Sequence, residues 1–371
     1  MSFSEWTKYK LGDFAELRKE QIPPKGKEQV YIGLEHIEQQ TLRINGVGSS
    51  NDVISNKFKF YSGDVLYGKL RPYFRKVYQP KFEGVCSTDI YVIKNKQGFD
   101  SSFLFYLVAT EEFTKIANSG STGTRMPRAD WNQLKVSEWL IPELPTQQKI
   151  ASILSSLDDK IELNNKTNQT LEAMAQSLFK EMCLPKDESQ KDWRVGKLGE
   201  IMENFDSKRK PLSSREREKR KGKYPYYGAA SIVDYVDDYL FEGIYLLFGE
   251  DGSVITAEEK PILQYVTGKF WVNNHTHVLR GIKEYSTEFL YLLLKNTNVR
   301  KLVTGAVQPK INQGNMNALE IIIPSKNVVE KLNGLVQPIF ENILINQQEN
   351  QTLAKLRNDL IPKLFKGEIK I

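Results

Sequence analysis

The sequence predicts an α+β (mixed α/β) protein made of two similar domains, each followed by a long helix, with the two helices paired as an antiparallel coiled coil. The first supporting observation is an internal repeat: the tetrapeptide Asn-Gln-Thr-Leu at 168–171 recurs at 350–353, 182 residues later. The second is a change from short β-like runs to a long helical pattern in both halves. The third is a pair of asparagines at the centre of each helix. Together they predict a pseudo-two-fold internal repeat.

Matching positions frame both halves of the chain. Ile141-Pro142 recurs as Ile323-Pro324 at the same spacing, and Leu11-Gly12 corresponds to Leu198-Gly199, 187 residues later. The interiors between these frames differ in sequence and composition. Two copies of one scaffold with divergent interiors indicate a molecule that does one job on two different targets.

The first domain is predicted at 1–145 and the second at 193–327, with a polar linker at 185–192 before the second domain. Both domains contain β-rich runs punctuated by glycine and proline turns, which is typical of a mixed α/β domain. The segments with the clearest patterns are strands at 30–34, 89–93 and 244–248, a short helix at 103–113, and its counterpart from about 288.

The long helices are predicted at 146–184 and 328–371, with apolar residues in steps of three and four. This spacing is the heptad seam of a coiled coil, although an ordinary amphipathic surface helix is the alternative for either helix taken alone. The predicted seams are Ile150, Leu154, Leu157, Ile161, Asn164, Asn168, Leu171, Ala175, Leu178 and Met182 in the first helix, and Leu332, Val336, Ile339, Ile343, Asn346, Asn350, Leu353, Arg357, Leu360 and Leu364 in the second.

The central asparagines predict the register of the coil. In an antiparallel pair Asn164 faces Asn350 and Asn168 faces Asn346, so each amide meets another amide instead of a leucine. Polar seam residues of this kind fix the register at a cost in stability. Pro338 interrupts the second helix because it has no N–H to donate, and we expect a kink there or a helix start just before it.

Composition places the chain among ordinary globular proteins, with 40% hydrophobic and 26% charged residues. No apolar run approaches the roughly 18–20 residues that a membrane span needs, and the N-terminus does not resemble a signal peptide. Cys86 and Cys183 have no metal-ligand spacing. We therefore expect a cytoplasmic protein with reduced cysteines and no membrane contact.

Basic charge is clustered. The net charge is +6, but the segment 207–223 contains nine basic and two acidic residues, a local charge of +7. A second segment, 65–81, has five basic residues and no acidic residue, and its cations are interleaved with aromatics. Clustered cations near aromatic rings are typical of proteins that bind a polyanion such as nucleic acid. A solvated charged loop is the alternative for either segment.

Arginine and lysine can neutralise phosphates, arginine can bond guanine edges, and aromatic rings can stack on bases. The glycine-containing loops at 119–125 and 304–310 occupy the same place in both repeats and could present backbone amides to phosphate, or could be tight turns before the last strand. The predicted DNA-contacting residues are Lys69, Arg71, Tyr73, Arg75, Arg125 and Arg128 in the first half, and Lys208, Arg209, Arg215, Arg217, Lys219, Arg220, Lys221, Lys223, Tyr226, Tyr227 and Lys310 in the second.

No catalytic motif is complete in this sequence. It has no phosphate-binding loop ending in Lys-Ser/Thr, no dinucleotide fingerprint and no Asn/Asp-Pro-Pro-aromatic tetrapeptide. His275 and His277 share one face of a predicted strand, but no third ligand is evident, so no metal site is predicted. No catalytic residue and no bound cofactor are predicted for this chain.

Several motifs resemble type I restriction–modification specificity subunits. They are Tyr61–Tyr73 (YSGDVLYGKLRPY), Cys86–Asp89, the run Ile-Pro-x-Leu-Pro-x-Gln-Gln before the first long helix, Lys210–Leu212, and Tyr224–Ala229. The resemblance covers essentially the whole chain. It implies two target recognition domains that each read half of a bipartite double-stranded DNA sequence, held apart by the coiled coil.

The resemblance also implies partners. Two methylation subunits would dock on this chain, two restriction subunits would join them, and S-adenosylmethionine, ATP and Mg would bind to those partners. The alternatives are a self-contained DNA methyltransferase or nuclease, the recognition subunit of a related type II-like system, and a coiled-coil adaptor that does not bind DNA. The missing cofactor and acid motifs disfavour an enzyme, and the repeated basic and aromatic loops disfavour an adaptor.

Overall fold

The computed structural model describes residues 6–23, 27–119, 126–184, 192–252, 254–305, 308–369 and 371. The chain divides into two compact units, Met1–Asn164 with Gln347–Ile371, and Asn165–Asn346. Each unit contains one domain together with a segment of both long helices. The boundary between the units therefore falls in the middle of both long helices and does not coincide with the ends of the predicted domains.

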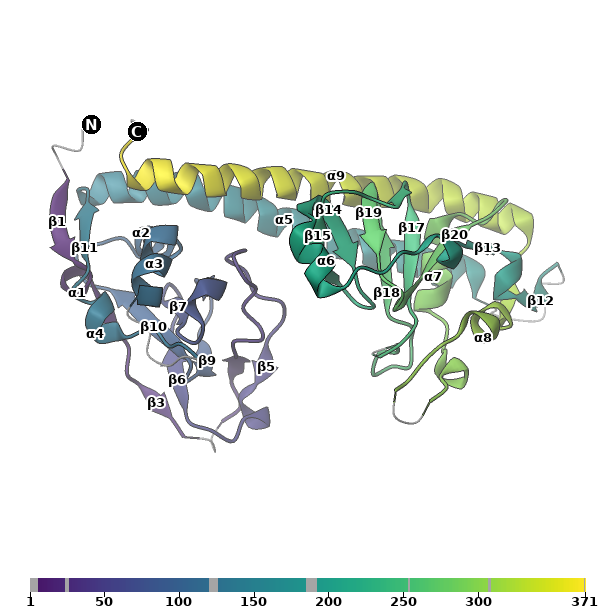
Figure 1. Cartoon of the computed structure of the whole chain (residues 1–371), viewed down its shortest axis with the longest axis horizontal. Coiled ribbons are helices and arrows are strands. Elements are labelled where there is room, and N and C mark those ends of the chain that lie inside the picture. Colours follow the sequence, from purple (N-terminus) through teal and green to yellow (C-terminus); the bar gives the residue numbers. More distant parts are fainter. Residues whose placement is uncertain are drawn as a thin grey trace. The chain divides into compact units, whose positions relative to one another are not determined.

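The first unit contains three β-sheets, drawn as arrows in Figure 1. Short helices accompany them: α1 (Leu11–Phe14), α2 (Ser101–Val108), α3 (Glu111–Ser119) and α4 (Trp131–Leu134). The sheets are β1 (Thr7–Lys10) with β11 (Glu138–Ile141); β2 (Ala15–Leu17), β10 (Ile90–Asn95), β7 (Val65–Gly68) and β8 (Val77–Tyr78); and β3 (Gln21–Ile22), β6 (Lys57–Phe60), β9 (Gly84–Ser87), β4 (Val30–Ile32) and β5 (Gly48–Ser49).

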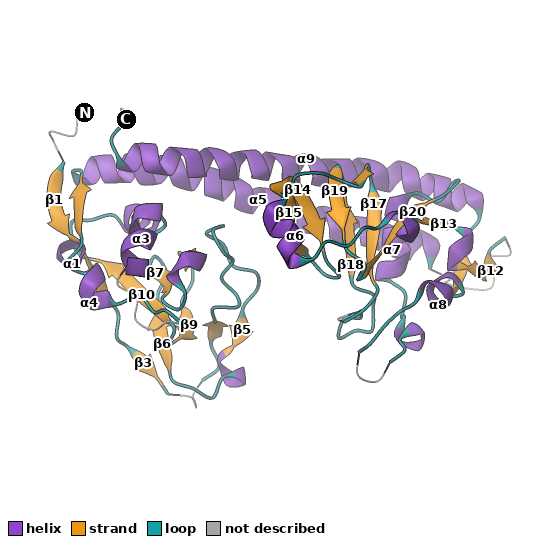
Figure 2. Cartoon of the chain, viewed as in Figure 1, coloured by secondary structure: helices purple, strands orange, loops and turns teal. Residues whose placement is uncertain are grey.

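The second unit repeats this arrangement, and its strands are orange in Figure 2. Its helices are α6 (Ser214–Lys219), α7 (Thr287–Lys295) and α8 (Gln313–Asn317). The sheets are β12 (Arg194–Lys197) with β21 (Glu320–Ile323); β13 (Met202–Asn204), β20 (Thr276–Gly281), β17 (Tyr245–Gly249) and β18 (Leu263–Val266); and β15 (Ile232–Val236), β14 (Lys221–Tyr227), β19 (Lys269–Val272) and β16 (Phe241–Glu242).

Strand pairing confirms the internal repeat that the sequence predicts. In both units the four-stranded sheet with the order β2-β10-β7-β8 or β13-β20-β17-β18 is antiparallel throughout. The remaining large sheet has one parallel pair in each unit, β4 with β9 and β14 with β19. Such a mixed sheet, repeated with the same pairing, is evidence for one scaffold used twice.

The predicted single helix at 103–113 is wrong, because the chain forms α2 and α3 with a break between them. The break follows from Thr110. Its hydroxyl donates to the Leu107 carbonyl at 2.7 Å and accepts from the Phe113 N–H at 3.1 Å. A threonine hydroxyl that accepts from an amide three residues later is an N-cap, which starts a new helix.

The two long helices are α5 (Leu144–Cys183) and α9 (Lys326–Phe365), each of 40 residues. Both begin two residues before the predicted starts, and α9 ends before the predicted end at 371. Pro145 is the second residue of α5, where a missing N–H has no effect because amides of the first turn have no partner within the helix. Among the described residues, no helix is long and apolar enough to cross a membrane.

Helix α9 continues through Pro338, so the predicted alternative of a start just before this proline is wrong. The carbonyl that loses its hydrogen-bond donor belongs to Gly334, four residues earlier. Both Gly334 and Pro338 are exposed, so water can bond that carbonyl on the solvent side. The helix therefore tolerates proline here without disturbing a buried part of its surface.

Asparagine pairs join α5 to α9 within each unit. In the first unit the Asn164 side-chain amide donates to the Asn350 Oδ1 at 2.9 Å and to Glu349 at 2.7 Å. In the second unit the Asn346 amide donates to the Asn168 Oδ1 at 2.8 Å. Because higher numbers on α5 meet lower numbers on α9, the helices run antiparallel, as predicted.

The pair Asn164–Asn350 provides a stability test. Asn164→Leu alone should lower the free energy of unfolding by about 1–3 kcal/mol, because a buried side-chain hydrogen bond is removed while its partner, Asn350, stays polar. Adding Asn350→Leu should recover most of this loss, since both polar groups are then removed. Thermal and urea unfolding measure both effects. Equal stability of the single variant and the wild type would contradict a role for this pair.

Candidate nucleic-acid interface

A strained turn joins β7 to β8 in the first unit. Arg71 and Arg75 flank a short 3-10 segment, Pro72–Phe74, and both have left-handed backbone angles, with φ of 52° and 49°. For residues other than glycine this conformation costs roughly 1–2 kcal/mol each. Such strain persists only where the surroundings hold it, and it is concentrated at functional sites.

The neighbouring loop at 40–42 is strained as well. Gln40 and Leu42 have φ of 63° and 65°, so four of the six described non-glycine residues with positive φ gather at this corner. The Gln40 N–H donates to the Arg75 carbonyl at 3.3 Å, which joins the loop to the turn. We call the turn 71–75 and the loop 40–42 together the strained corner.

Hydrogen bonds hold the turn at both ends. The Arg71 N–H donates to the Pro127 carbonyl at 2.7 Å. The Arg75 guanidinium donates to the Ala109 carbonyl at 2.7 Å and lies 3.5 Å from the Glu111 carboxylate. Arg75 therefore anchors the turn to the protein, and its guanidinium is already engaged by protein acceptors.

Other predicted residues of the first unit remain available to a ligand. Among the described residues, the side chains of Lys69 and Arg71 have no hydrogen bond or ion pair; they lie over the rings of Tyr91 (5.4 Å) and Phe74 (6.0 Å). Tyr73 is 46% exposed. The exposed Arg128 is only loosely paired with Asp89, at 3.4 Å. Arg125 and most of the 119–125 loop lie outside the described residues.

Two predicted cations of the second unit belong to an internal ion network. The Arg209 guanidinium donates to Glu250 at 2.6 Å and to the Thr276 carbonyl at 2.8 Å, and it lies 3.4 Å from Asp206. Lys310, in the predicted 304–310 loop, pairs with Glu250 at 3.2 Å. These interactions hold strand ends and loops together, so neither cation is free for phosphate.

His277 completes this network. One ring nitrogen lies 2.5 Å from the Asp206 carboxylate, and the other lies 2.8 Å from the Ile311 carbonyl. Burial alone raises the pKa of Asp206, but the hydrogen bonds from His277 and Val278 and the nearby positive charges lower it below its usual range.

Asp206, Glu250 and His277 also lie close enough together to hold a metal ion. Sequence reasoning missed this grouping, because the two carboxylates come from distant segments. Arg209 and Lys310 already neutralise both carboxylates, and a divalent cation would be repelled by them. His275 pairs separately with Asp251 at 2.7 Å. The cluster is therefore an ionic brace of the fold.

Aspartates of the neighbouring strand and loop offset part of the charge of 207–223. Arg217 and Lys221 both bond Asp234, at 3.2 and 2.7 Å, and Arg220 bonds Asp237 at 2.9 Å. Pairing of β14 with β15 brings these acids in, so a local count of charge overstates the free positive charge. Five cations of this region remain exposed, without an ion pair among the described residues: Lys208, Lys210, Arg215, Lys219 and Lys223.

The predicted tyrosines of the second half are structural. Tyr226 is 1% exposed, and its hydroxyl accepts from the Leu212 N–H at 2.9 Å. Tyr227 packs edge-on against Phe270, with centroids 5.7 Å apart, and burial raises its pKa. Their rings therefore face the protein instead of a ligand.

The helices carry a second repeated feature. Leu163 on α5 and Leu356 on α9 are 59% and 45% exposed in the first unit, and their repeat counterparts Ile345 and Met174 are 60% and 50% exposed in the second. Each unit therefore presents one equivalent pair of exposed apolar side chains. The 182-residue offset between these positions is visible in the sequence, but the exposure of their side chains becomes evident only once the contact seam between α5 and α9 is known.

Similarity to known proteins is found in both repeats of the chain. A family model described as type I restriction modification DNA specificity domain matches residues 3–173 and again 190–355. The type I restriction enzyme MjaIX specificity subunit of Methanocaldococcus jannaschii is 29% identical, over 74% of this chain and 71% of its own. The HindI specificity subunit of Haemophilus influenzae is 25% identical, over 99% and 100% respectively.

The type I restriction–modification S subunit of M. genitalium has a similar fold, with a TM-score of 0.53 and 19% identity over 97% of this chain and 96% of that one. The family model matches most of the sequence, in two copies, one over each structural repeat. This chain therefore belongs to the type I restriction–modification DNA specificity family and is a specificity subunit.

Proposed function

We propose that each domain of this specificity subunit reads one half of a bipartite double-stranded DNA target. One observation carries this proposal: equivalent places in the two repeats hold different polar groups. Lys69 and Glu250 follow β7 and β17 directly, and each accepts a backbone hydrogen bond, from Ala129 and Ile311 respectively. Tyr91 and His277 lie beside them on β10 and β20. One scaffold whose equivalent positions carry different side chains suits two different half-sites.

Within the first domain, the strained corner is proposed to carry base recognition. Among the residues that the structure describes, none pairs with the Arg71 guanidinium; its backbone is firmly held, and Tyr73 is exposed next to it. A guanidinium can bond the O6 and N7 of guanine in the major groove. Lys69 and Arg128 would contact the backbone nearby. In the second domain, Lys208, Arg215, Lys219 and Lys223 would contact phosphates.

The chain is proposed to perform no catalysis itself. S-adenosylmethionine would bind to methylation subunits, and ATP and Mg to restriction subunits. The equivalent exposed pairs Leu163–Leu356 and Ile345–Met174 support docking of two copies of one partner, because equivalent apolar positions recur once in each unit. We assign these pairs to two methylation subunits, with two restriction subunits joining the complex.

Domain exchange tests the proposed function. Replacing residues 1–145 by the first domain of another family member should change one half of the methylated motif and leave the other half intact. Sequencing of methylated sites in host DNA reads out both halves at once. Exchange of 193–327 is the matched experiment for the second half. A change in both halves after either exchange, or in neither, would contradict one half-site per domain.

The phosphate-binding role of the second domain predicts a uniform loss of affinity. Arg215→Ala, Lys219→Ala and Lys223→Ala together should weaken binding similarly on all sequences and reduce the salt slope by up to about 0.9 for each phosphate that is no longer neutralised. Lys180→Ala, Lys301→Ala and Lys331→Ala remove equal charge elsewhere in this unit and should leave the slope almost unchanged. Equal effects of both triple variants would assign the loss to net charge alone.

Charged substitutions test the docking surfaces. Leu163→Lys with Leu356→Lys should leave one methylation subunit bound instead of two, because a lysine in an apolar interface must be desolvated. Native mass spectrometry measures the subunit ratio. Ser156→Lys with Thr352→Lys, at exposed polar positions of the same unit, should keep two bound. The isolated chain with S-adenosylmethionine and DNA is the activity control, and it should transfer no methyl group.

A further inference from the structure

A buried arginine joins the helix pair to the strained corner. Arg357 on α9 is 2% exposed, and its guanidinium pairs with Asp158 on α5 at 2.5 Å. The same guanidinium donates to the Thr41 carbonyl at 3.1 Å. Asp158 also accepts from the Tyr106 hydroxyl at 2.7 Å. All four residues belong to the first unit.

The second unit shows that the helix pair does not need this ion pair. Through the 182-residue repeat, Asp158 corresponds to Phe340 and Arg357 to Ala175. Both counterparts are buried in an apolar core, at 4% and 0% exposure. Burying two charges carries a desolvation penalty that apolar packing avoids. The ion pair between Asp158 and Arg357 is therefore better explained by what Arg357 contacts outside the helix pair.

That contact is the strained corner. Thr41 lies between Gln40 and Leu42, the two residues with positive φ in the loop, and the Gln40 N–H donates to the Arg75 carbonyl at 3.3 Å. Arg75 closes the turn that presents Arg71. A continuous series of polar contacts therefore runs from Asp158 and Arg357 through the loop to the turn.

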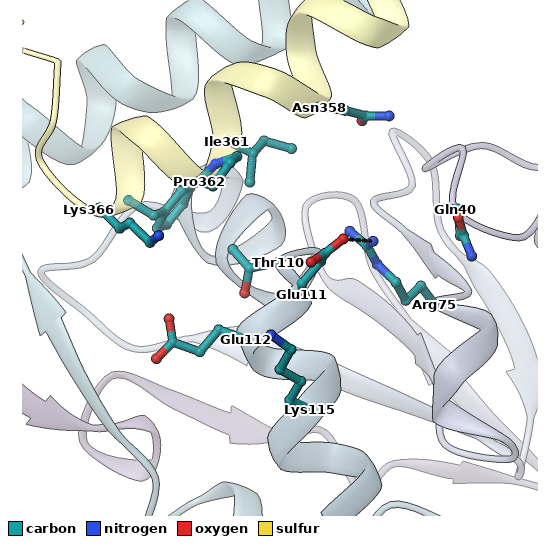
Figure 3. Close-up of a pocket in the computed structure, with 11 residues that line it drawn as sticks. Gln40, Arg75, Thr110, Glu111, Glu112, Lys115, Asn358, Ile361, Pro362 and Lys366 are labelled. Carbon is teal, nitrogen blue, oxygen red and sulfur yellow. Dashed lines mark hydrogen bonds and ion pairs between the residues drawn. The ribbon is translucent and has the colours of Figure 1, made fainter.

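A cavity beside this series leaves the corner open on one side. It has a volume of about 650 Å³ and is lined by Gln40, Arg75 and Glu111 on one side and by Asn358 and Ile361 of α9 on another (Figure 3). The figure shows the paired side chains of Arg75 and Glu111 at its edge. Side chains do not fill the space between α9 and the strained corner here, so the position of the loop 40–42 depends more on hydrogen bonds than on packing.

We propose that Arg357 is a positioning residue for DNA recognition by the first domain, acting through the loop 40–42 on the turn that carries Arg71. The proposal rests on the proposed function of this corner. Arg357 is buried and does not touch DNA. It holds the loop in its strained conformation, and the loop holds the Arg75 end of the turn. Since a bidentate contact to a base edge depends on the direction of the guanidinium, a small shift of the turn reduces discrimination.

The test replaces the buried ion pair of the first unit by the apolar pair found at the equivalent positions of the second unit. Asp158→Phe with Arg357→Ala reproduces the pair Phe340 and Ala175, and Tyr106→Phe removes the hydroxyl that would lose its carboxylate acceptor. The full-length variant is assembled with its methylation subunits. Binding is compared between the target identified from host methylation and duplexes with one base pair changed in either half-site. Tyr106→Phe alone is the matched control.

The triple variant should lose roughly ten- to hundredfold of discrimination in the first half-site, the range of one bidentate contact, and keep its discrimination in the second. Its thermal unfolding should match or exceed that of the wild type. Arg71→Ala should lose discrimination at one base pair of the same half-site. Arg357→Met, which keeps the length of the side chain, provides the same readout if the triple variant does not assemble.

Unchanged discrimination in a folded triple variant would make Arg357 purely structural and overturn the proposal. Equal loss in both half-sites would also overturn it, because the effect would then be global. If Arg71→Ala changes neither half-site, the turn is not the reading element and the proposal fails, whereas reading by two domains still stands. A wild-type complex without sequence preference would refute the proposed function itself.

Discussion

The pairing of α5 with α9 is the constraint on which both domains depend. In the first unit the core combines Ile150 and Leu154 of α5 with Ile361 and Leu364 of α9. In the second unit, Ala175 and Phe179 of α5 lie in the same core as Leu332 and Val336 of α9. Each domain core is therefore closed by residues from both repeats.

This arrangement means that neither repeat of the sequence is a complete folding unit. The segment 347–371 is far from 1–164 in the chain but belongs to the same compact unit. A core that needs such distant segments forms only after a long loop has been closed, which slows the folding of each unit. The asparagine pairs, one in each unit, then hold the helices in the one register that suits both cores.

The features that could be predicted from the sequence are the ones encoded by local spacing. Heptad steps and matched asparagines indicated the helices and their antiparallel register, because both depend on periodicity within one segment. Features set by the register of paired strands, or by which face of a sheet is covered, could not be predicted. The neutralisation of Arg217 and Lys221 depends on the register of β14 with β15, and the burial of Tyr226 depends on which face of that sheet is covered.

The candidate interface shows the same division. Arg71 and Tyr73 could be identified from the sequence as candidate DNA-contacting residues, because a basic and aromatic run is a local pattern. The distinction between Arg71 as available and Arg75 as an anchor depends on acceptors at Ala109 and Glu111, which lie on other elements. For the same reason Arg209 looked like a phosphate ligand and is instead part of an internal ion network.

Backbone hydrogen bonds explain how one scaffold can carry two specificities. At the equivalent positions Lys69 and Glu250, the carbonyl accepts from the next strand-like segment, from Ala129 in one unit and Ile311 in the other. These bonds use only main-chain atoms, so they place no demand on the side chain. A lysine in one domain and a glutamate in the other therefore keep the same local structure. The side chain can therefore differ at this position while β7 and β17 keep their places in the sheet.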